Sequence, residues 1–278
     1  MQPMTAAAIS TRNLIGAPDA ALQEMDRWLG RAAEQGAELA LFPELNVSGY
    51  IPSEAARTIA ETIPGPSTDK AVRLAARHRM TFAFGLIERA GERLHCSHVL
   101  VNGDGVLGWQ RKIHVPAQEQ SAWSAGDAIE VIDMGKARIG IAICRDAFFD
   151  EMTRTLYFKG AEIVLMPFGY YNVPRSRYMQ ETIHGKSLVK SAWTNGYFEL
   201  VCNSAGERPA GPFDARERRF PGWAGIIDPW GKVLGFADEE GNAESMVVRP
   251  LDPADLLGRR SHSNFLAREL RPELYRFS

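Results

Sequence analysis

The chain has 278 residues, 45% of them hydrophobic, and a formal net charge of −2. That is enough apolar material for a substantial core, so we expect a globular protein. Basic residues are interspersed with acidic ones, so the chain lacks the clustered positive charge that is typical of proteins that bind nucleic acid or anionic membranes. We therefore expect neither as a partner.

The first part of the chain alternates short apolar runs with longer amphipathic segments. Hydrophobic residues recur at spacings of three and four over 19–34, which predicts a helix, and Gly36 is a suitable end for it. Alternating strands and helices are typical of an α/β architecture. The predicted elements are strands at 6–9, 38–44, 81–89 and 94–102 and helices at 19–34 and 67–79.

Two later segments, 101–109 and 226–236, each combine a turn with an apolar strand. They predict two hairpins, one at an edge of each half of a repeated fold. Gly103, Gly105 and Gly108 also match the GxGxxG pattern of dinucleotide-binding proteins, but that pattern requires a helix after the glycines. Because a strand follows and Asn-Gly-Asp-Gly favours a hairpin, we predict no nucleotide site.

No long linker rich in proline, serine or glycine divides the chain, so residues 1–278 are predicted to form a single domain. The polar stretches 205–219 and 237–244 are interpreted as surface loops. The last segment, 254–278, is charged and aromatic. We expect this C-terminal arm either to cap the domain or to reach a second subunit.

The cysteines and the N-terminal residues indicate a cytoplasmic protein. Cys96, Cys144 and Cys202 lie far apart without a CxxC pattern, which fits a reducing compartment better than a disulfide scaffold. The N-terminal residues show no charged leader followed by a long apolar stretch, and no run of about 18 apolar residues occurs. Neither export nor membrane insertion is expected.

Three apolar runs end in side chains that are suited to catalysis. Glu44 follows LALFP, Lys112 comes just after the strand at 107–109, and Cys144 ends RIGIAIC. Sites in open α/β sheets assemble at the carboxyl ends of strands, and a cysteine nucleophile needs a base and a positive charge nearby. Each residue alone is more often structural, but the three together predict an active site.

Six ordered blocks surround these residues. They are LFPEL with the following SGY (41–50), RKIHVP (111–116), GIAICRDAFFDE (140–151), GAEIVLMPFG (160–169), NGYFELVCNSAG (195–206) and FPGWAGIIDPWGKVLG (220–235). Together they resemble the nitrilase superfamily of carbon–nitrogen hydrolases. Six blocks in order are far more specific than any one of them.

The resemblance implies a Glu–Lys–Cys triad of Glu44, Lys112 and Cys144, with a second glutamate, Glu119, seven residues after the lysine. It implies an α/β fold of the nitrilase type, a four-layer αββα sandwich, which agrees with the two hairpin-bearing halves. Members usually associate through a surface beside the site, often with C-terminal extensions. We therefore expect a homo-oligomer, a dimer or larger, in which 254–278 takes part.

The reaction implied is cysteine-dependent hydrolysis of a non-peptide C–N bond through a thioester. Glu44 would take the thiol proton of Cys144, and Lys112 would favour the thiolate. Lys112 and the backbone N–H of Arg145 would stabilise the oxyanion. After ammonia leaves, water activated by Glu44 and positioned by Glu119 would hydrolyse the thioester. No metal or organic cofactor is required.

The residues after the cysteine bear on the substrate. Nitrilases commonly have Cys-Trp-Glu, whereas Cys-Arg-Asp resembles the amidase and carbamoylase branches, so we expect a small linear amide or N-carbamoyl compound. The segment 167–177 is expected to border the pocket, where Arg175 and Arg177 are conceivable partners of a substrate carboxylate or residues of a solvated loop. Four aromatic residues fit either pocket wall or core: Tyr50, Phe168, Tyr170 and Trp193.

Other reactive side chains are interpreted as structural. His95 and His98 flank Cys96, but strand alternation points the two histidines to opposite faces, so no metal site is predicted. Cys96 and Cys202 are expected to pack in the core. The remaining residues are Asp146, Asp150 and Glu151, expected to favour a helix start, and His184, whose role stays open.

Two other functions remain open. The same residues would serve an acyltransferase that passes the thioester to an amine. The fold would also suit a small-molecule-binding protein without turnover, although retention of all three triad residues argues against it.

Overall fold

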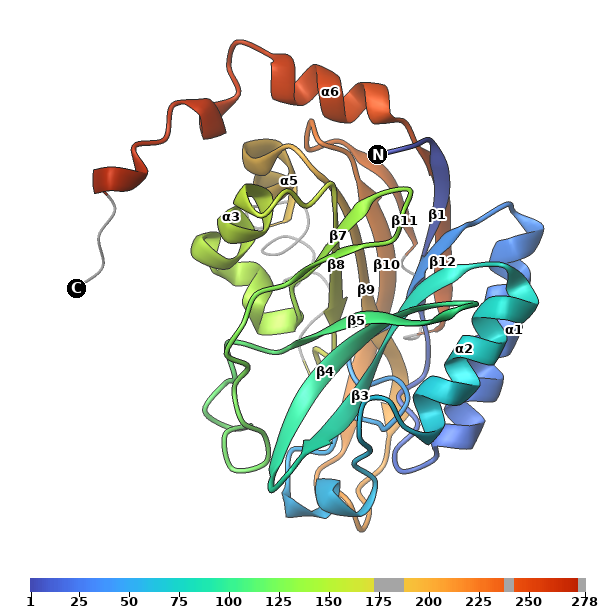
Figure 1. Ribbon diagram of the computed structural model, residues 1–278. Helices are drawn as coiled ribbons and strands as arrows, with labels where there is room; N and C mark the ends of the chain where they lie inside the picture. The colour runs from blue at the N-terminus through green and yellow to red at the C-terminus, as the bar shows by residue number, and fades with distance from the viewer. Residues whose placement is uncertain (173–187, 238–242, 275–278) are drawn as a thin grey trace.

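The computed structural model describes residues 1–172, 188–237 and 243–274. In these residues two six-stranded sheets lie face to face (Figure 1). The first sheet consists, in spatial order, of β12 (Ser245–Leu251), β1 (Met4–Ser10), β2 (Leu39–Leu41), β3 (Thr81–Ala90), β4 (Arg93–Asn102) and β5 (Gly105–Arg111). The second consists of β11 (Val233–Ala237), β10 (Arg218–Ile227), β9 (Phe198–Arg208), β8 (Ile163–Phe168), β7 (Arg138–Ile141) and β6 (Val131–Asp133).

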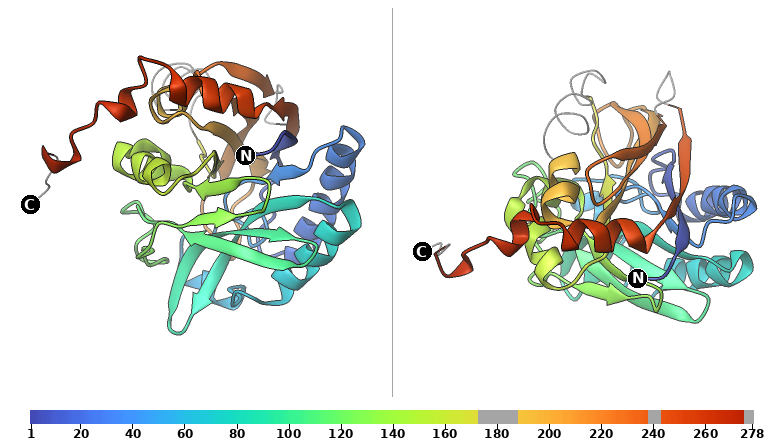
Figure 2. Two further views of the ribbon diagram at one scale, coloured as in Figure 1. Left: turned by 45° about the horizontal axis from the view of Figure 1, so that its top comes forward. Right: turned by 90° about the horizontal axis from the view of Figure 1, so that it is seen from above.

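Helices cover the outer face of each sheet (Figures 1 and 2). α1 (Pro18–Glu34) and α2 (Pro66–His78) pack on the first sheet, and α3 (Asp150–Phe158) and α5 (Leu188–Asn195) lie on the second. The predicted four-layer αββα sandwich is therefore confirmed. None of the helices in the described ranges has the length and apolar character needed to span a bilayer.

Side-chain alternation along the strands builds two cores at once. In β1, Ala6 and Ala8 belong to the core between the sheets, whereas Ala7 and Ile9 belong to the core beneath α1 and α2. β1, β2 and β3 pair in parallel, and strands of this kind are buried on both faces. This explains why their sequences read as continuous apolar runs.

Both predicted hairpins are confirmed. β4 turns into β5 between Asn102 and Gly105, and β10 turns into β11 between Ile227 and Val233. β5 and β11 are edge strands of the two different sheets. The glycines of the GxGxxG pattern therefore lie in a β-hairpin, as the turn sequence indicated.

The predicted surface loop at 205–219 is shorter than expected. β9 continues to Arg208 and β10 begins at Arg218, and these two residues are antiparallel partners. Asp214, in the turn between the strands, accepts hydrogen bonds from Arg208 Nη2 at 2.6 Å and from Arg218 Nε at 2.5 Å. The Asp214 carboxylate offsets the charge of the two arginines, so these polar residues can extend the strands. A prediction based on hydrophobic runs does not detect such an extension.

The C-terminal arm begins by packing on its own chain. α6 (Pro253–Ser261) crosses the end of the sandwich (Figure 2). Arg259 donates from Nη2 to the carbonyl oxygen of Trp193 at 2.8 Å. Arg260 donates from Nε to the carbonyl oxygen of Gly196 at 2.7 Å. The last described residues extend away from the sandwich (Figure 1). α6 thus packs on its own chain, and the contact of 254–278 with a second subunit stays a prediction.

Candidate active site

Glu44 lies in a turn that leaves β2 and docks on β3. The side chain of Asn46 accepts a hydrogen bond from the Gly85 nitrogen at 2.9 Å, and the Val47 nitrogen donates to the Gly85 oxygen at 3.0 Å. A side chain at position 85 would clash, because its Cβ would lie 2.3 Å from the nitrogen of Leu45. The turn is thereby fixed, and Glu44 is 1% exposed.

Lys112 follows β5 and is completely buried. Its backbone nitrogen donates to the carbonyl oxygen of Cys96 at 2.8 Å. Its Nζ donates to Glu44 Oε1 at 2.8 Å and to Glu119 Oε2 at 2.7 Å. One ammonium thus stabilises two carboxylates that burial alone would disfavour, and it offsets part of their negative charge. These bonds use two of its three N–H groups.

Glu119 is held from its other side by Tyr50. The Tyr50 hydroxyl donates to Glu119 Oε1 at 2.6 Å, and its ring packs edge-on against Trp123. Burial and the nearby carboxylates raise the pKa of Tyr50, so the hydroxyl remains a donor. Burial also raises the pKa of Glu119, and Glu44 adds to this while Lys112 opposes it. Tyr50 is therefore a hydrogen-bonding partner of the cluster.

Cys144 lies where the chain leaves β7 and enters the short helix η2 (Cys144–Phe148). Its φ is +49°, a left-handed conformation that is uncommon for a residue other than glycine and that is found often at functional sites. A backbone hydrogen bond joins the thiol to Gly169, just after β8. A Cβ at position 169 would lie 2.8 Å from Glu44 Oε2, so Gly169 contacts both the base and the nucleophile.

Electrostatics keep the resting nucleophile protonated. Burial raises the pKa of Cys144 well above its ordinary value, and Glu44 raises it further, while Lys112 lowers it. Burial lowers the pKa of Lys112, but Glu44, Cys144 and Glu119 raise it well above its ordinary value, so the ammonium persists. Lys112 does favour the thiolate, as expected, but burial and Glu44 outweigh it. The Cys144 thiol at rest therefore keeps its proton.

Asp146 fastens the turn of the nucleophile to the segment after Lys112. Its fully buried carboxylate accepts hydrogen bonds from the His114 nitrogen at 2.7 Å, from His114 Nδ1 at 2.8 Å and from the Ile143 nitrogen at 3.2 Å. The His114 ring stacks on Phe149 with 3.7 Å between ring centroids. Asp146 therefore has a structural role, as expected. It acts by joining two loops through hydrogen bonds, whereas the sequence suggested a role at the start of a helix.

Arg145, Tyr170 and Phe168 lie on the Cys144 side of the cluster. The exposed Arg145 side chain hydrogen-bonds Tyr170, and burial, followed by Cys144, raises the pKa of Tyr170 to about 12. Phe168 is the buried last residue of β8, and its ring contacts that of Phe148. Tyr170 therefore lies near Cys144, whereas Phe168 packs in the core against Phe148.

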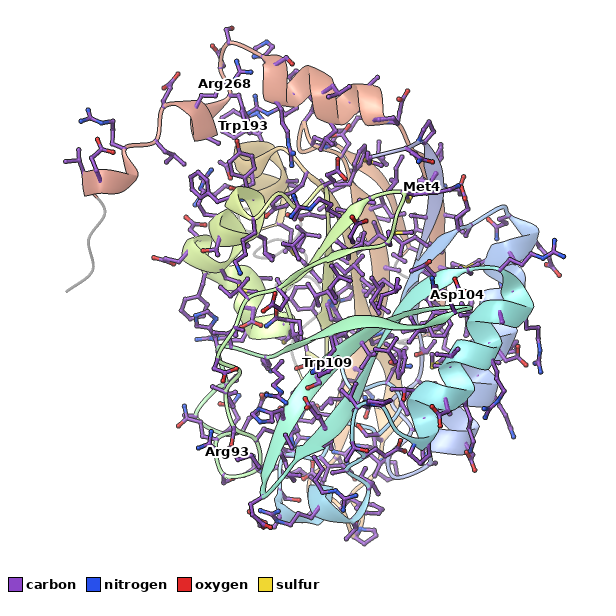
Figure 3. The ribbon with its side chains drawn as sticks, viewed as in Figure 1. Met4, Arg93, Asp104, Trp109, Trp193 and Arg268 are labelled. Carbon is purple, nitrogen blue, oxygen red and sulfur yellow. The ribbon has the colours of Figure 1, made fainter. Side chains whose placement is uncertain are left out.

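Trp193 is not brought to this cluster. It lies on α5, is 38% exposed, and packs against the guanidinium of Arg259 at 4.8 Å from its ring centroid. Figure 3 shows it beside the C-terminal segment that carries Arg268. The interpretation of Trp193 as a pocket wall is corrected, because the sequence did not indicate that α6 returns to α5.

A cavity of about 470 Å³ lies next to the cluster. Its volume is within the range of small-molecule sites. It lies between the segment after Lys112 and the turn of Cys144. Its lining includes Ile113, His114, Pro116, Trp123, Arg145 and Phe149.

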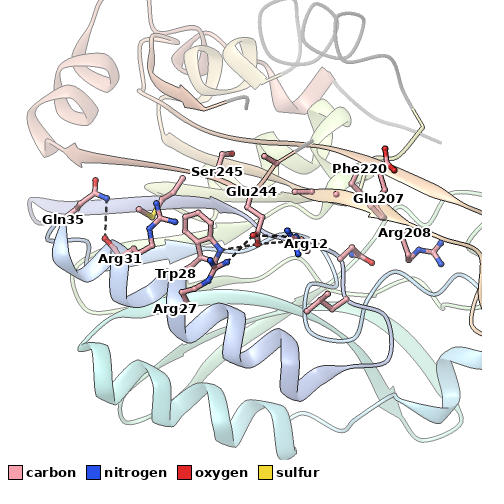
Figure 4. A pocket seen from close by; sticks show the side chains of 16 residues that line it. Arg12, Arg27, Trp28, Arg31, Gln35, Glu207, Arg208, Phe220, Glu244 and Ser245 are labelled. Carbon is pink, nitrogen blue, oxygen red and sulfur yellow. Dashed lines mark hydrogen bonds and ion pairs between the residues drawn. The ribbon is translucent and has the colours of Figure 1, made fainter. Parts of the chain in front are cut away.

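A second cavity, of about 720 Å³, lies between α1 and the strands β9 and β12 (Figure 4). Glu244 accepts hydrogen bonds there from Arg27 Nη2 at 3.2 Å and from Trp28 Nε1 at 3.4 Å. Burial raises the pKa of Glu244, and its contact with Glu24 raises it further. The described residues that line this cavity include no member of the cluster, so the two places are separate.

Within the described ranges, no group of three or more His, Cys, Asp and Glu side chains is arranged to hold a metal ion. Arg175, Arg177 and His184 lie outside the described residues. Most of the predicted loop at 237–244 also lies outside them.

The αββα sandwich and the buried acid, ammonium and thiol together define a class of protein, the nitrilase superfamily. The model of the carbon-nitrogen hydrolase family matches residues 5–256. The chain therefore belongs to the carbon–nitrogen hydrolases.

Its relatives include both nitrilases and amidases. The chain is 29% identical to a nitrilase of Pyrococcus abyssi, over 93% of this chain and 94% of the relative. It is 27% identical to an (R)-stereoselective amidase of a Pseudomonas species, over 82% of this chain and 78% of the relative. The crystal structure of a carbon–nitrogen hydrolase from Helicobacter pylori G27 shares the fold, with a TM-score of 0.86 at 22% identity, covering 99% of this chain and 97% of that one.

The contacts of Cys96 and Gly169 are among those in the cluster that were not predicted from the sequence. The Cys96 thiol donates to Glu44 Oε1 at 3.5 Å, and Gly169 fits between Glu44 and Cys144. Predicting the position of Cys96 beside the end of β5 would have required the register between β4 and β5, which the sequence does not show. The glycine after the strand at 163–168 was a usable signal, because a small residue at a strand end permits close approach.

Proposed function

We propose that this protein hydrolyses a non-peptide C–N bond of a small amide or N-carbamoyl compound through a thioester on Cys144. The observation that carries the proposal is the buried Lys112 ammonium, bonded to Glu44 and Glu119 and interacting electrostatically with Cys144. Family membership supports the reaction class. The finer claims, the amide substrate and the role of each residue, are the proposal.

In the first half of the reaction the Cys144 proton moves to Glu44 Oε2, which has no hydrogen-bond partner among the described residues. The sulfur forms a bond to the carbonyl carbon as the C=O electron pair moves onto oxygen. The third N–H of Lys112 and the backbone N–H of Arg145 receive this oxyanion. Glu44 returns the proton to the nitrogen, and the C–N bond breaks to release ammonia.

In the second half water attacks the thioester. Glu44 accepts a proton from the water, and Glu119 orients it. The C–S bond breaks as the proton passes to sulfur, which restores the Cys144 thiol and releases the acid. The same carboxylate therefore acts in both halves of the reaction, and no imidazole is needed.

Amides are placed ahead of nitriles because Cys144 is followed by Arg145 and Asp146, a pattern similar to the amidase and carbamoylase branches. An amidase of a Nesterenkonia species, 23% identical with a TM-score of 0.76, covers 96% of this chain and is covered over 95% of its own length. Nitrile hydrolysis is the second candidate, since relatives with 28–29% identity are named nitrilases.

The test is ammonia release from a panel of linear amides, N-carbamoyl acids and nitriles, measured for the parent, Cys144→Ala and the control Cys202→Ala. We expect release from amides or carbamoyl compounds by the parent and the control, and loss of release in Cys144→Ala. Mass spectrometry of the trapped protein is expected to show an acyl group on Cys144. An active Cys144→Ala protein would refute the mechanism.

The same panel separates the alternatives. Release only from nitriles favours a nitrilase. Acyl transfer that occurs only when an amine acceptor is added favours a transferase. Binding of panel compounds without any adduct on Cys144 favours a protein without turnover.

A further inference from the structure

Cys96 contacts both the base and the ammonium of the cluster. It lies in β4, opposite Ile87 of β3, and is 1% exposed. Its carbonyl oxygen accepts a hydrogen bond from the Lys112 nitrogen at 2.8 Å, and its Sγ donates to Glu44 Oε1 at 3.5 Å. One residue thus holds Lys112 through the main chain and Glu44 through the side chain.

The two oxygens of Glu44 have different surroundings. Oε1 receives Nζ of Lys112 at 2.8 Å and also the thiol of Cys96. Oε2 is buried and has no hydrogen-bond partner in the described part of the chain. It faces Gly169, whose backbone is hydrogen-bonded to Cys144. Two donors on one oxygen therefore orient the other oxygen toward the nucleophile.

The Cys96 thiol is suited to donate and not to attack. Burial raises its pKa well above the ordinary value, and Glu44 raises it further, while Lys112 opposes the shift. The group therefore keeps its proton, and a thiol is a weak but real donor.

We propose that Cys96 is a positioning residue, whose thiol holds Glu44 Oε1 so that Oε2 is directed at Cys144. This inference rests on the proposed function, in which Glu44 is the base. Cys96 takes no part in bond making. If Cys96 only filled space in the core, as the sequence predicted, any side chain of similar volume could replace it. The test must therefore remove the S–H donor and keep the volume.

Cys96→Val and Cys96→Ser are the two informative variants, because both nearly preserve the size and only serine keeps a donor. Cys202→Val is the matched control. Cys202 is equally buried on β9, and its Sγ lies 3.8 Å from the carbonyl oxygen of Leu41, away from the carboxylates.

We expect Cys96→Val to lower kcat roughly fivefold to tenfold, the effect of one lost hydrogen bond, with KM little changed. The acid limb of kcat/KM is expected to move to higher pH, because a lost donor disfavours the ionised carboxylate. Cys96→Ser is expected to recover most of both, and Cys202→Val to change neither. Parent-like kinetics in Cys96→Val, or a Cys96→Ser protein as impaired as Cys96→Val, would overturn the proposal.

The contact itself has a readout that needs no substrate. The S–H stretching bands in the infrared spectrum are assigned by their loss in Cys96→Val and Cys202→Val. Glu44→Gln is expected to move the Cys96 band to higher frequency, because a neutral amide oxygen is a weaker acceptor than a carboxylate oxygen, and to leave the Cys202 band unchanged. An unmoved Cys96 band would refute the contact. If no panel compound is hydrolysed, the proposed function fails, and this band alone decides whether Cys96 holds Glu44.

Discussion

Lys112 supplies the positive charge that faces both glutamates of the site. It faces two carboxylates, and the structure accommodates the excess of negative charge through Glu119, whose pKa is raised by burial and by Glu44. Glu44 keeps one oxygen unpartnered in the described residues. In the proposed reaction the two glutamates therefore have different tasks, proton transfer for Glu44 and orientation for Glu119.

Glu119→Gln tests this division. The amide preserves size and can still accept the Tyr50 hydroxyl, but it removes one partner of Lys112. We expect kcat to fall about 100-fold, the cost that misplacement of a reacting group can have, while KM changes little. Steady-state kinetics on the best panel substrate measures the effect. Tyr50→Phe, which removes only one hydrogen bond, is expected to cost about tenfold or less. Equal kcat in Glu119→Gln and the parent would contradict the assignment.

The raised pKa of Cys144 predicts a pH dependence that needs no substrate. A thiol whose pKa is raised is mostly protonated near neutral pH, so alkylation of Cys144 by iodoacetamide accelerates as pH rises from 7 toward 9. Glu44→Gln removes a charge that opposes the thiolate, and alkylation at pH 7 is expected to become faster while turnover is lost. Peptide mapping gives the rate at Cys144 alone. A rate that is independent of pH over this range would be inconsistent with the burial described.

At the level of elements, Asp146 joins two loops that are far apart in the chain. Asp146→Ala leaves the His114 and Ile143 nitrogens without their acceptor. We expect a loss of about 3 kcal/mol in the free energy of unfolding, measured by urea denaturation, together with lower activity. Asp150→Ala is the matched control, because its exposed ion pair with Lys190 is expected to contribute less than about 1 kcal/mol. Equal losses in the two variants would argue against the clamp.

The sequence allowed the elements that carry Glu44, Lys112 and Cys144 to be predicted, because buried strands leave long apolar runs and polar residues mark where they end. It did not allow contacts across the sheets to be predicted. Tyr50 reaches Glu119 and Cys96 reaches Glu44 only through strand register and loop return, which local pattern does not encode. Trp193 was misplaced for the same reason, since its neighbour Arg259 comes from a distant helix.

At the level of the whole molecule, α6 ties the C-terminal segment to the second layer of helices. Arg259 is 1% exposed and donates to a carbonyl oxygen near the end of α5, where positive charge is favourable. Arg259→Ala is expected to lower the free energy of unfolding by about 2–3 kcal/mol, because it leaves that carbonyl unpaired and opens a void. Arg268→Ala, an exposed position at the end of the short helix η4 (Leu266–Arg268), is expected to change it by less than about 0.5 kcal/mol. Urea denaturation compares the two, and similar values would mean that α6 contributes little.

The expected homo-oligomer remains a prediction. Large apolar side chains are exposed on α3, α5, α6 and the segment after it, namely Phe158, Trp193, Leu257, Leu266 and Leu274. Sedimentation of the purified chain decides between a particle of 30.8 kDa and a multiple of that mass.

Glu44 and Lys112 follow strands of one sheet, whereas Cys144 and Gly169 follow strands of the other. The reactive groups therefore meet only at the seam between the layers. A slip of about 1 Å along that seam can cost about 100-fold in rate while leaving the hydrogen-bond ladder within each sheet unbroken. Mild heating is thus expected to abolish turnover before the strands unfold. Activity therefore reports the relative position of the two sheets more sensitively than circular dichroism of the backbone does.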